Sequence, residues 1–175
     1  KTLGLKASTV PQLMAEARKV VSGRGLDITP FKELLEKYVD EEKIRSSPCD
    51  LYVTSLSVTD RREVVFDVKQ APSGTIKDVL LASAFFPAFK NEKLGGKTYL
   101  DGGMVNNVPV DVLAERGYKN LIVIRIYGIG VDTERRTELS EDVNVYRIAP
   151  RRNLGGILEF EKKKTRRNMT LGYFD

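Results

Sequence analysis

The stretch NLIVIRIY at residues 120–127 decides the fold class of this chain. Its apolar residues are nearly continuous: Leu121, Ile122, Val123, Ile124 and Ile126. A run of this kind predicts a β-strand that is covered on both faces, as strands are in the sheets of α/β proteins.

Helical and strand patterns alternate on both sides of this stretch. Apolar residues at helical spacing predict helices over residues 11–21, 30–38, 76–84, 109–113 and 154–168. Strand patterns occupy residues 51–58, 64–68, 98–100 and 143–148, and a charged turn makes the first two a hairpin or neighbouring strands. Thr29 and Thr75 are the expected N-caps, and the helix over 76–84 must end before Pro87. The alternation predicts an α/β sandwich, and the length fits one domain over residues 1–175.

Composition restricts the chemistry that the chain can perform. Histidine is absent, so neither a Ser-His-Asp nor a Cys-His site can be built from these residues alone. The single cysteine, Cys49, precedes an apolar run and is expected to be a buried packing thiol. Without histidines or a cysteine pair, and with scattered carboxylates, no metal site is indicated, and we expect no cofactor.

The net charge of +5 is concentrated at the end of the chain. Residues 151–175 hold seven of the 29 basic residues but only three of the 24 acidic ones. The basic cluster consists of Lys162, Lys163, Lys164, Arg166 and Arg167. It is either a solvated helix face or a site of peripheral membrane contact with anionic lipid headgroups. No nucleic-acid motif accompanies it, so nucleic acid is not an expected partner.

The sequence shows neither an apolar stretch long enough to span a membrane nor a secretory leader. Because the chain begins at Lys1, a leader could have been removed, and the localisation stays open, with the cytoplasm or a membrane surface favoured. The oligomeric state is not predicted.

The densest group of turn-forming residues is YLDGGMVNNVP at residues 99–109. Asp101 ends a short strand there, and Gly102 and Gly103 allow the chain to turn sharply and to approach another segment closely. A carboxylate held at a strand end can face a cleft and act as a general base. The alternative is a turn aspartate that only accepts hydrogen bonds from nearby amides.

Other polar and aromatic residues near this turn have structural explanations. Asn106 and Asn107 could line a cleft, but capping of the following helix is favoured. Ser83 lies in an apolar helical stretch, where bonding to its own backbone is expected. A set of aromatic-rich positions is expected to pack in the core instead of forming an acyl pocket: Phe85, Phe86, Pro87 and Phe89. Asp111 is expected to have a surface or first-turn role on the next helix.

The order and spacing of these motifs resemble the patatin-like phospholipase family. The resemblance rests on LASAFFP at 81–87, DGG at 101–103, NNVPVDV at 106–112 and the strand from Asn120, with weaker support from GLDITP at 25–30 and from RRN to GY at 166–173. It covers essentially the whole chain as part of a patatin-like domain. It implies a three-layer α/β/α lipid acyl hydrolase that uses a Ser-Asp dyad, in which Asp101 matches the catalytic aspartate.

One part of the family pattern is missing, because no serine of this chain stands in a G-x-S-x-G elbow. We expect that the nucleophile segment has been truncated, cleaved or left out, and that this chain is inactive by itself. The missing strand should then leave an unpaired sheet edge and an apolar patch that include residues of the strands at 51–58 and 120–127. The expected substrate is a phospholipid or another acyl ester, of unknown headgroup and acyl chain. The alternative is a non-catalytic lipid-binding or regulatory module with the same fold.

Overall fold

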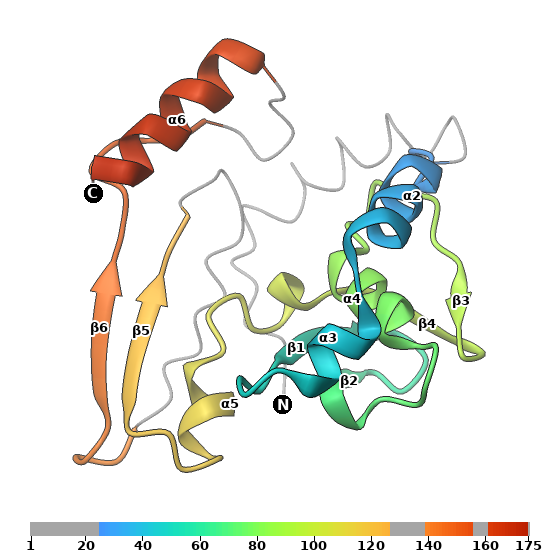
Figure 1. Ribbon diagram of the computed structural model, residues 1–175, viewed down its shortest axis with the longest axis horizontal. Helices are drawn as coiled ribbons and strands as arrows, with labels where there is room; N and C mark the ends of the chain where they lie inside the picture. The colour runs from blue at the N-terminus through green and yellow to red at the C-terminus, as the bar shows by residue number, and fades with distance from the viewer. Residues whose placement is uncertain (1–24, 127–138, 156–160, 175) are drawn as a thin grey trace. The chain divides into compact units, whose positions relative to one another are not determined.

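The computed structural model describes residues 25–126, 139–155 and 161–174, and the helix expected over 11–21 lies outside these ranges. The described residues form a mixed α/β structure (Figure 1). The chain divides into two compact units, Lys1–Asn107 and Val108–Asp175, which are described separately. The three-layer arrangement and the single domain therefore stay predictions.

An antiparallel sheet forms the centre of the first unit, with strand order β2-β1-β4-β3. Its strands are β1 (Tyr52–Ser57), β2 (Arg62–Asp67), β3 (Lys93–Leu94) and β4 (Lys97–Asp101). The predicted hairpin is confirmed: β1 and β2 pair from Tyr52↔Asp67 to Ser57↔Arg62. β4 lies along the other edge of β1, where Asp101 is opposite Ser55. The sheet thus fixes the end of β4 against a central strand.

The described helices of this unit are α2 (Thr29–Tyr38), α3 (Glu41–Ser46) and α4 (Ile76–Ala84), with the short helical turns η1 (Val68–Gln70) and η2 (Gly102–Met104). As predicted, α4 ends before Pro87. Its buried residues contribute to two clusters, one around Phe85 and one around Val68 and Ile76. Phe85 is fully buried and Phe89 packs against the same cluster, which confirms their predicted core role. The buried side chains of α4 are therefore part of the core that packs against the sheet.

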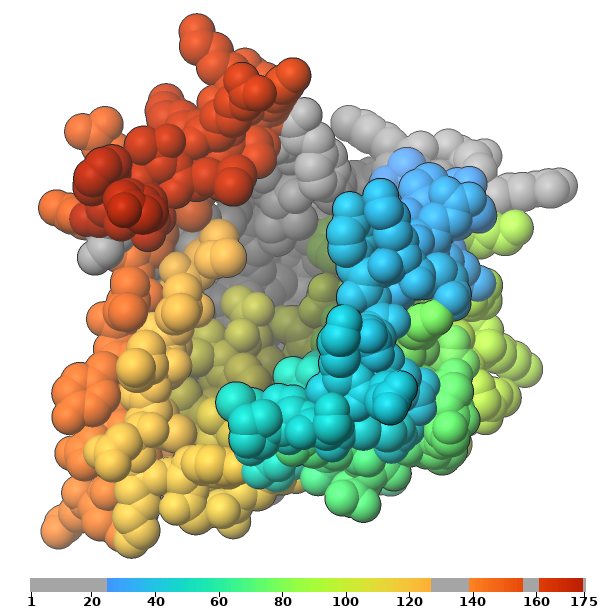
Figure 2. Space-filling model, viewed as in Figure 1, coloured from blue at the N-terminus to red at the C-terminus, as the bar shows by residue number. Residues whose placement is uncertain are grey.

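The second unit contains α5 (Val110–Ala114), β5 (Asn120–Ile124), β6 (Asn144–Ile148) and α6 (Lys162–Phe174). β5 and β6 pair in parallel from Asn120↔Asn144 to Ile124↔Ile148, and Figure 1 draws them as two arrows that point the same way. In Figure 2 the atoms of helix α6, drawn in red, are visible at the surface. Leu121 and Val123 pack in a cluster with Val110. One face of β5 is therefore buried.

The expectation that this strand is covered on both faces is wrong for the described residues. Burial alternates along β5, and Ile122 and Ile124 expose 69% and 73% of their surface. Among the described strands, β5 pairs only with β6. The exposed isoleucines agree with the apolar patch that the sequence predicted on this strand. The unpaired edge predicted for the strand at 51–58 is wrong, because β1 pairs with β2 on one side and with β4 on the other.

Three local predictions also differ from the structure. Ile28, not Thr29, is the N-cap of α2, because Asp27 accepts the hydrogen bonds from the Thr29 backbone and hydroxyl. Cys49 is exposed because it lies in the loop before β1 and not in the strand. Leu154 and Gly155 lie outside the last helix: Gly155 has a φ of 103° and donates to Asn153 Oδ1, which is incompatible with helix.

Candidate functional site

Asp101 is the last residue of β4 and caps the η2 turn. Its backbone N–H donates to the carbonyl of Phe85 over 2.8 Å. Opposite it, the fully buried Ser55 hydroxyl lies 2.8 Å from the carbonyl oxygens of both Ala82 and Leu100. The candidate aspartate is therefore fixed by the end of α4 and by β1 at the same point.

Gly102 allows the η2 turn to lie directly on strand β1. A Cβ atom at this position would stand 2.2 Å from the backbone oxygen of Thr54 and 2.4 Å from its hydroxyl. No side chain fits in that space, so the predicted close approach of this glycine is confirmed by its surroundings. At Gly103 the nearest atoms to a Cβ are side-chain oxygens of Asn107 and Asp101, both at 3.0 Å.

The carboxylate of Asp101 is half-buried. Burial raises its pKa above the usual range, and the hydrogen bond that Gly103 N–H donates to Oδ1 over 2.7 Å opposes this effect. Among the residues that the structure describes, Oδ2 has no hydrogen-bond partner and the carboxylate makes no ion pair. One oxygen is thus held by the turn while the other is available as a base with increased basicity.

Asp67 gives an internal comparison for this geometry. It ends β2, caps the η1 turn and accepts a hydrogen bond from the amide of Lys69, two residues further on, over 3.1 Å. Asp101 has the same relation to Gly103. Both aspartates are half-buried, so the turn alone does not identify a base; the close packing of Gly102 on Thr54 distinguishes the turn at Asp101.

The segment after η2 is anchored by Asn106. Its buried side chain donates from Nδ2 to Glu63 Oε1 on β2 over 3.1 Å. The predicted capping by Asn106 or Asn107 is wrong, because Pro109 is the N-cap of α5 and no side chain caps that helix. The contact between Asn106 and Glu63 joins residues 43 positions apart, so no local sequence pattern could have indicated it.

Asp111 lies in the first turn of α5, as predicted, but the alternative prediction of a surface role is wrong. It is buried, and its Oδ1 accepts a hydrogen bond from the backbone of Val112. It is therefore unsuitable as a neutral control for substitutions at Asp101.

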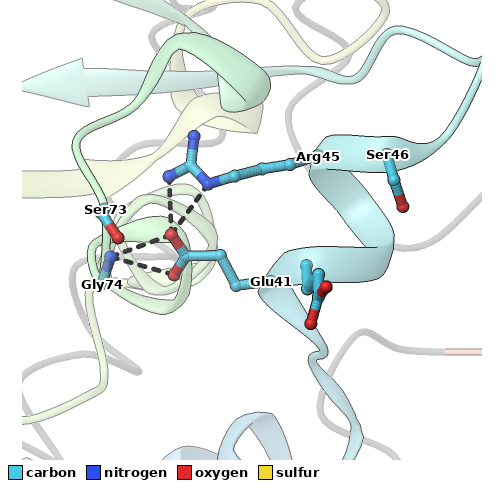
Figure 3. A pocket seen from close by; sticks show the side chains of 6 residues that line it. Glu41, Arg45, Ser46, Ser73 and Gly74 are labelled. Carbon is cyan, nitrogen blue, oxygen red and sulfur yellow. Dashed lines mark hydrogen bonds and ion pairs between the residues drawn. The ribbon is translucent and has the colours of Figure 1, made fainter.

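An open depression of about 600 Å³ lies at α3, lined by Glu41, Glu42, Arg45, Ser46, Ser73 and Gly74 (Figure 3). Arg45 bonds Glu41 over 2.6 and 2.9 Å, and Gly74 N–H donates to the same carboxylate. These hydrogen bonds lower the pKa of Glu41, that from Gly74 most. The main polar groups here satisfy one another, so the depression is a structural junction. The i,i+4 spacing of Glu41 and Arg45 is the sequence signal that could have indicated it.

No group of three potential metal ligands occurs within the described ranges. In those same ranges, no helix has the length and apolar character needed to cross a bilayer.

Comparison with known proteins gives one result beyond this geometry. No curated protein matches the chain. A family model described as patatin-like phospholipase matches residues 9–114, which include α2 through α5 and the turn at Asp101. This match covers more than half of the sequence. The chain therefore belongs to the patatin-like phospholipase family.

Proposed function

We propose that this chain supplies the catalytic base of a lipid acyl hydrolase that cleaves fatty acyl esters, with Asp101 as the aspartate of a Ser-Asp dyad in a three-layer α/β/α fold. Family membership supports the reaction class. The observation that carries the proposal is the half-buried carboxylate of Asp101, with a raised pKa and a free oxygen. The serine would come from residues beyond these 175, since no G-x-S-x-G elbow occurs among them.

In this reaction Asp101 accepts the proton of the serine hydroxyl while the serine oxygen attacks the ester carbonyl carbon. The tetrahedral intermediate then breaks its bond to the leaving alcohol, which takes the proton from Asp101. Water, deprotonated by the same carboxylate, attacks the acyl-serine carbonyl; the bond to the serine oxygen then breaks, the serine oxygen takes the proton back from Asp101, and the fatty acid is released. Burial assists the first step because a more basic carboxylate takes the proton of an alcohol more readily. The developing oxyanion requires backbone donors near the serine.

The test is Asp101→Asn in the protein that contains the elbow serine. Asparagine keeps the acceptor for Gly103 N–H but is not a base, so we expect kcat/KM for an acyl ester to fall by about 10² to 10⁴. Asp67→Asn is the matched control, because Asp67 caps a turn by the same hydrogen bond. It should leave turnover within about threefold of the wild type.

Near wild-type turnover in Asp101→Asn, with an inactive elbow-serine variant, would show that another group accepts the proton. Equal losses in the Asp67 and Asp101 variants would assign both residues to turn stability alone.

A non-catalytic lipid-binding module is the second candidate, favoured by the absence of the elbow serine from the sequence. The two candidates differ in what the serine-containing protein does with a nitrophenyl acyl ester. Turnover that depends on Asp101 supports the hydrolase, whereas lipid binding without turnover supports the module.

A further inference from the structure

Helix α6 (Lys162–Phe174) carries a high positive charge. Five of its residues are basic and none is acidic: Lys162, Lys163, Lys164, Arg166 and Arg167. Lys162 and Arg166, like Lys163 and Arg167, stand at i,i+4, where equal charges repel each other. The lysines also occupy the first turn, where the helix dipole disfavours cations. These unfavourable interactions would be relieved by an anionic partner.

The described residues supply little compensation for this charge. Lys162, Lys163, Arg166 and Arg167 make no ion pair with any of the described carboxylates. Arg151 instead donates to the carbonyl of Phe174 at the other end of the helix. The charges of these four exposed side chains are therefore directed to solvent.

One face of α6 is attached to its unit and the opposite face is free. Lys164, Asn168 and Leu171 follow helical spacing and are half-buried, and Asn168 donates to the carbonyl of Leu154 over 2.7 Å. The opposite face contains Lys162, Arg166, Met169 and Tyr173. All four residues of this second face are exposed to solvent.

The exposed face carries both basic and large apolar side chains, and exposure of the apolar side chains to water is unfavourable. Met169 and Tyr173 expose 72% and 83% of their surface, and Phe174 beside them is also exposed. In a helix that serves only its own core, such residues would point inward. Exposed basic side chains are attracted to anionic headgroups, and exposed large apolar side chains are stabilised where they enter the membrane interface.

We propose that α6 binds the surface of an anionic lipid bilayer, with its basic half against the headgroups and with Met169, Tyr173 and Phe174 in the interface. The choice of lipid over another polyanion rests on the proposed lipid hydrolase. The exposed apolar end supports it independently, because phosphate-backbone binding would make no use of Met169 or Phe174. Binding through α6 does not require Asp101.

The experiment measures sedimentation of the 175-residue chain with phosphatidylcholine vesicles and with vesicles that also contain phosphatidylserine. We expect binding to the anionic vesicles only, weakened by salt. Arg166→Gln with Arg167→Gln should lower the partition coefficient about 25-fold, since each basic residue near an anionic surface contributes about fivefold. The control is Arg61→Gln with Arg62→Gln, another adjacent exposed pair, which should change it less than about threefold.

A second pair of variants tests the apolar end. Tyr173→Ser should weaken vesicle binding about tenfold, because one large apolar side chain no longer enters the interface. Tyr38→Ser on α2, which replaces another exposed tyrosine at 68%, should have no effect. Circular dichroism checks that all variants remain folded.

Several outcomes would overturn the proposal. Equal binding to neutral and anionic vesicles would do so, as would equal effects of the two arginine pairs. Binding to duplex DNA that is stronger than vesicle binding and lost with Arg166 and Arg167 would assign α6 to nucleic acid. Because Asp101→Asn should bind vesicles like the wild type, failure of this proposal and failure of the hydrolase proposal give different results.

Discussion

The contact between the η2 turn and β1 can be tested by Gly102→Ala. The new Cβ would lie 2.2 Å from the Thr54 backbone oxygen, about 1.2 Å short of the 3.4 Å at which ordinary contact begins. The atoms that must move belong to the backbone of a strand paired on both sides. A side-chain rotation cannot relieve the clash, so β1 or the turn must shift.

Overpacking of this kind costs about 1 to 3 kcal/mol. We expect the upper end, about 3 kcal/mol, because the clash is with backbone and Gly102 is buried. For a chain of this length the melting temperature should fall by about 6 to 12 °C. Gly102 does not have a positive φ, so backbone strain adds nothing to this cost.

Urea unfolding followed by circular dichroism measures the free energy of unfolding in the 175-residue chain. Two glycine variants serve as controls. Gly103→Ala should cost less, because its nearest contacts are side-chain oxygens at 3.0 Å. Gly172→Ala on α6 should stabilise the helix by about 0.5 to 1 kcal/mol, because no atom lies within 4 Å of its Cβ. If Gly102→Ala unfolds within about 0.5 kcal/mol of the wild type, the turn does not pack on β1 as described.

Two further perturbations test single side chains. Because burial raises the pKa of Asp101 in the folded state, its ionised form destabilises the fold above that pKa, and the penalty disappears as the pH falls towards 3.8. Asp101→Asn should therefore exceed the wild type in unfolding free energy near about pH 7, with a smaller difference near about pH 4; a constant difference would contradict this. Arg45→Met should lower the free energy of unfolding by about 2 to 3 kcal/mol, since the substitution removes hydrogen bonds to Glu41 and to the carbonyls of Lys69 and Ala71. Lys43→Met, which breaks only an exposed ion pair, should lose less than about 1 kcal/mol, and equal losses would contradict the assignment of Arg45.

Much of the fold could be predicted because its signals are local. The hairpin of β1 and β2 followed from two strand patterns around a charged turn, and the end of α4 followed from Pro87. Local sequence does not determine whether both faces of a strand are covered. The apolar run at 120–127 correctly indicated β5, but its burial depends on which neighbours pack against it, and Ile122 is exposed. Cys49 was mispredicted for the same reason, since nearness in sequence to an apolar strand does not bury a loop residue.

The candidate site shows the same division between local and tertiary information. The sequence indicated that Asp101 ends a strand before two glycines, and the structure agrees. Asp67 makes the equivalent turn without any glycine pair, so a strand-end aspartate by itself has no catalytic meaning. The raised pKa of Asp101 comes from burial, which packing contacts from distant parts of the chain create.

Those contacts come from segments that are far apart in the sequence. Phe85 at the end of α4 accepts the Asp101 N–H, and Ser55 on β1 bonds the carbonyl that precedes it. The close approach at Gly102 brings Thr54 against the turn. The basicity of Asp101 is therefore a property of the assembled sheet. It follows that a variant such as Gly102→Ala, which removes no titratable group, should lower the pKa of Asp101 by admitting water beside it. If the pKa of Asp101 is unchanged in Gly102→Ala although the stability of that variant has fallen as expected, burial by β1 does not cause the raised pKa.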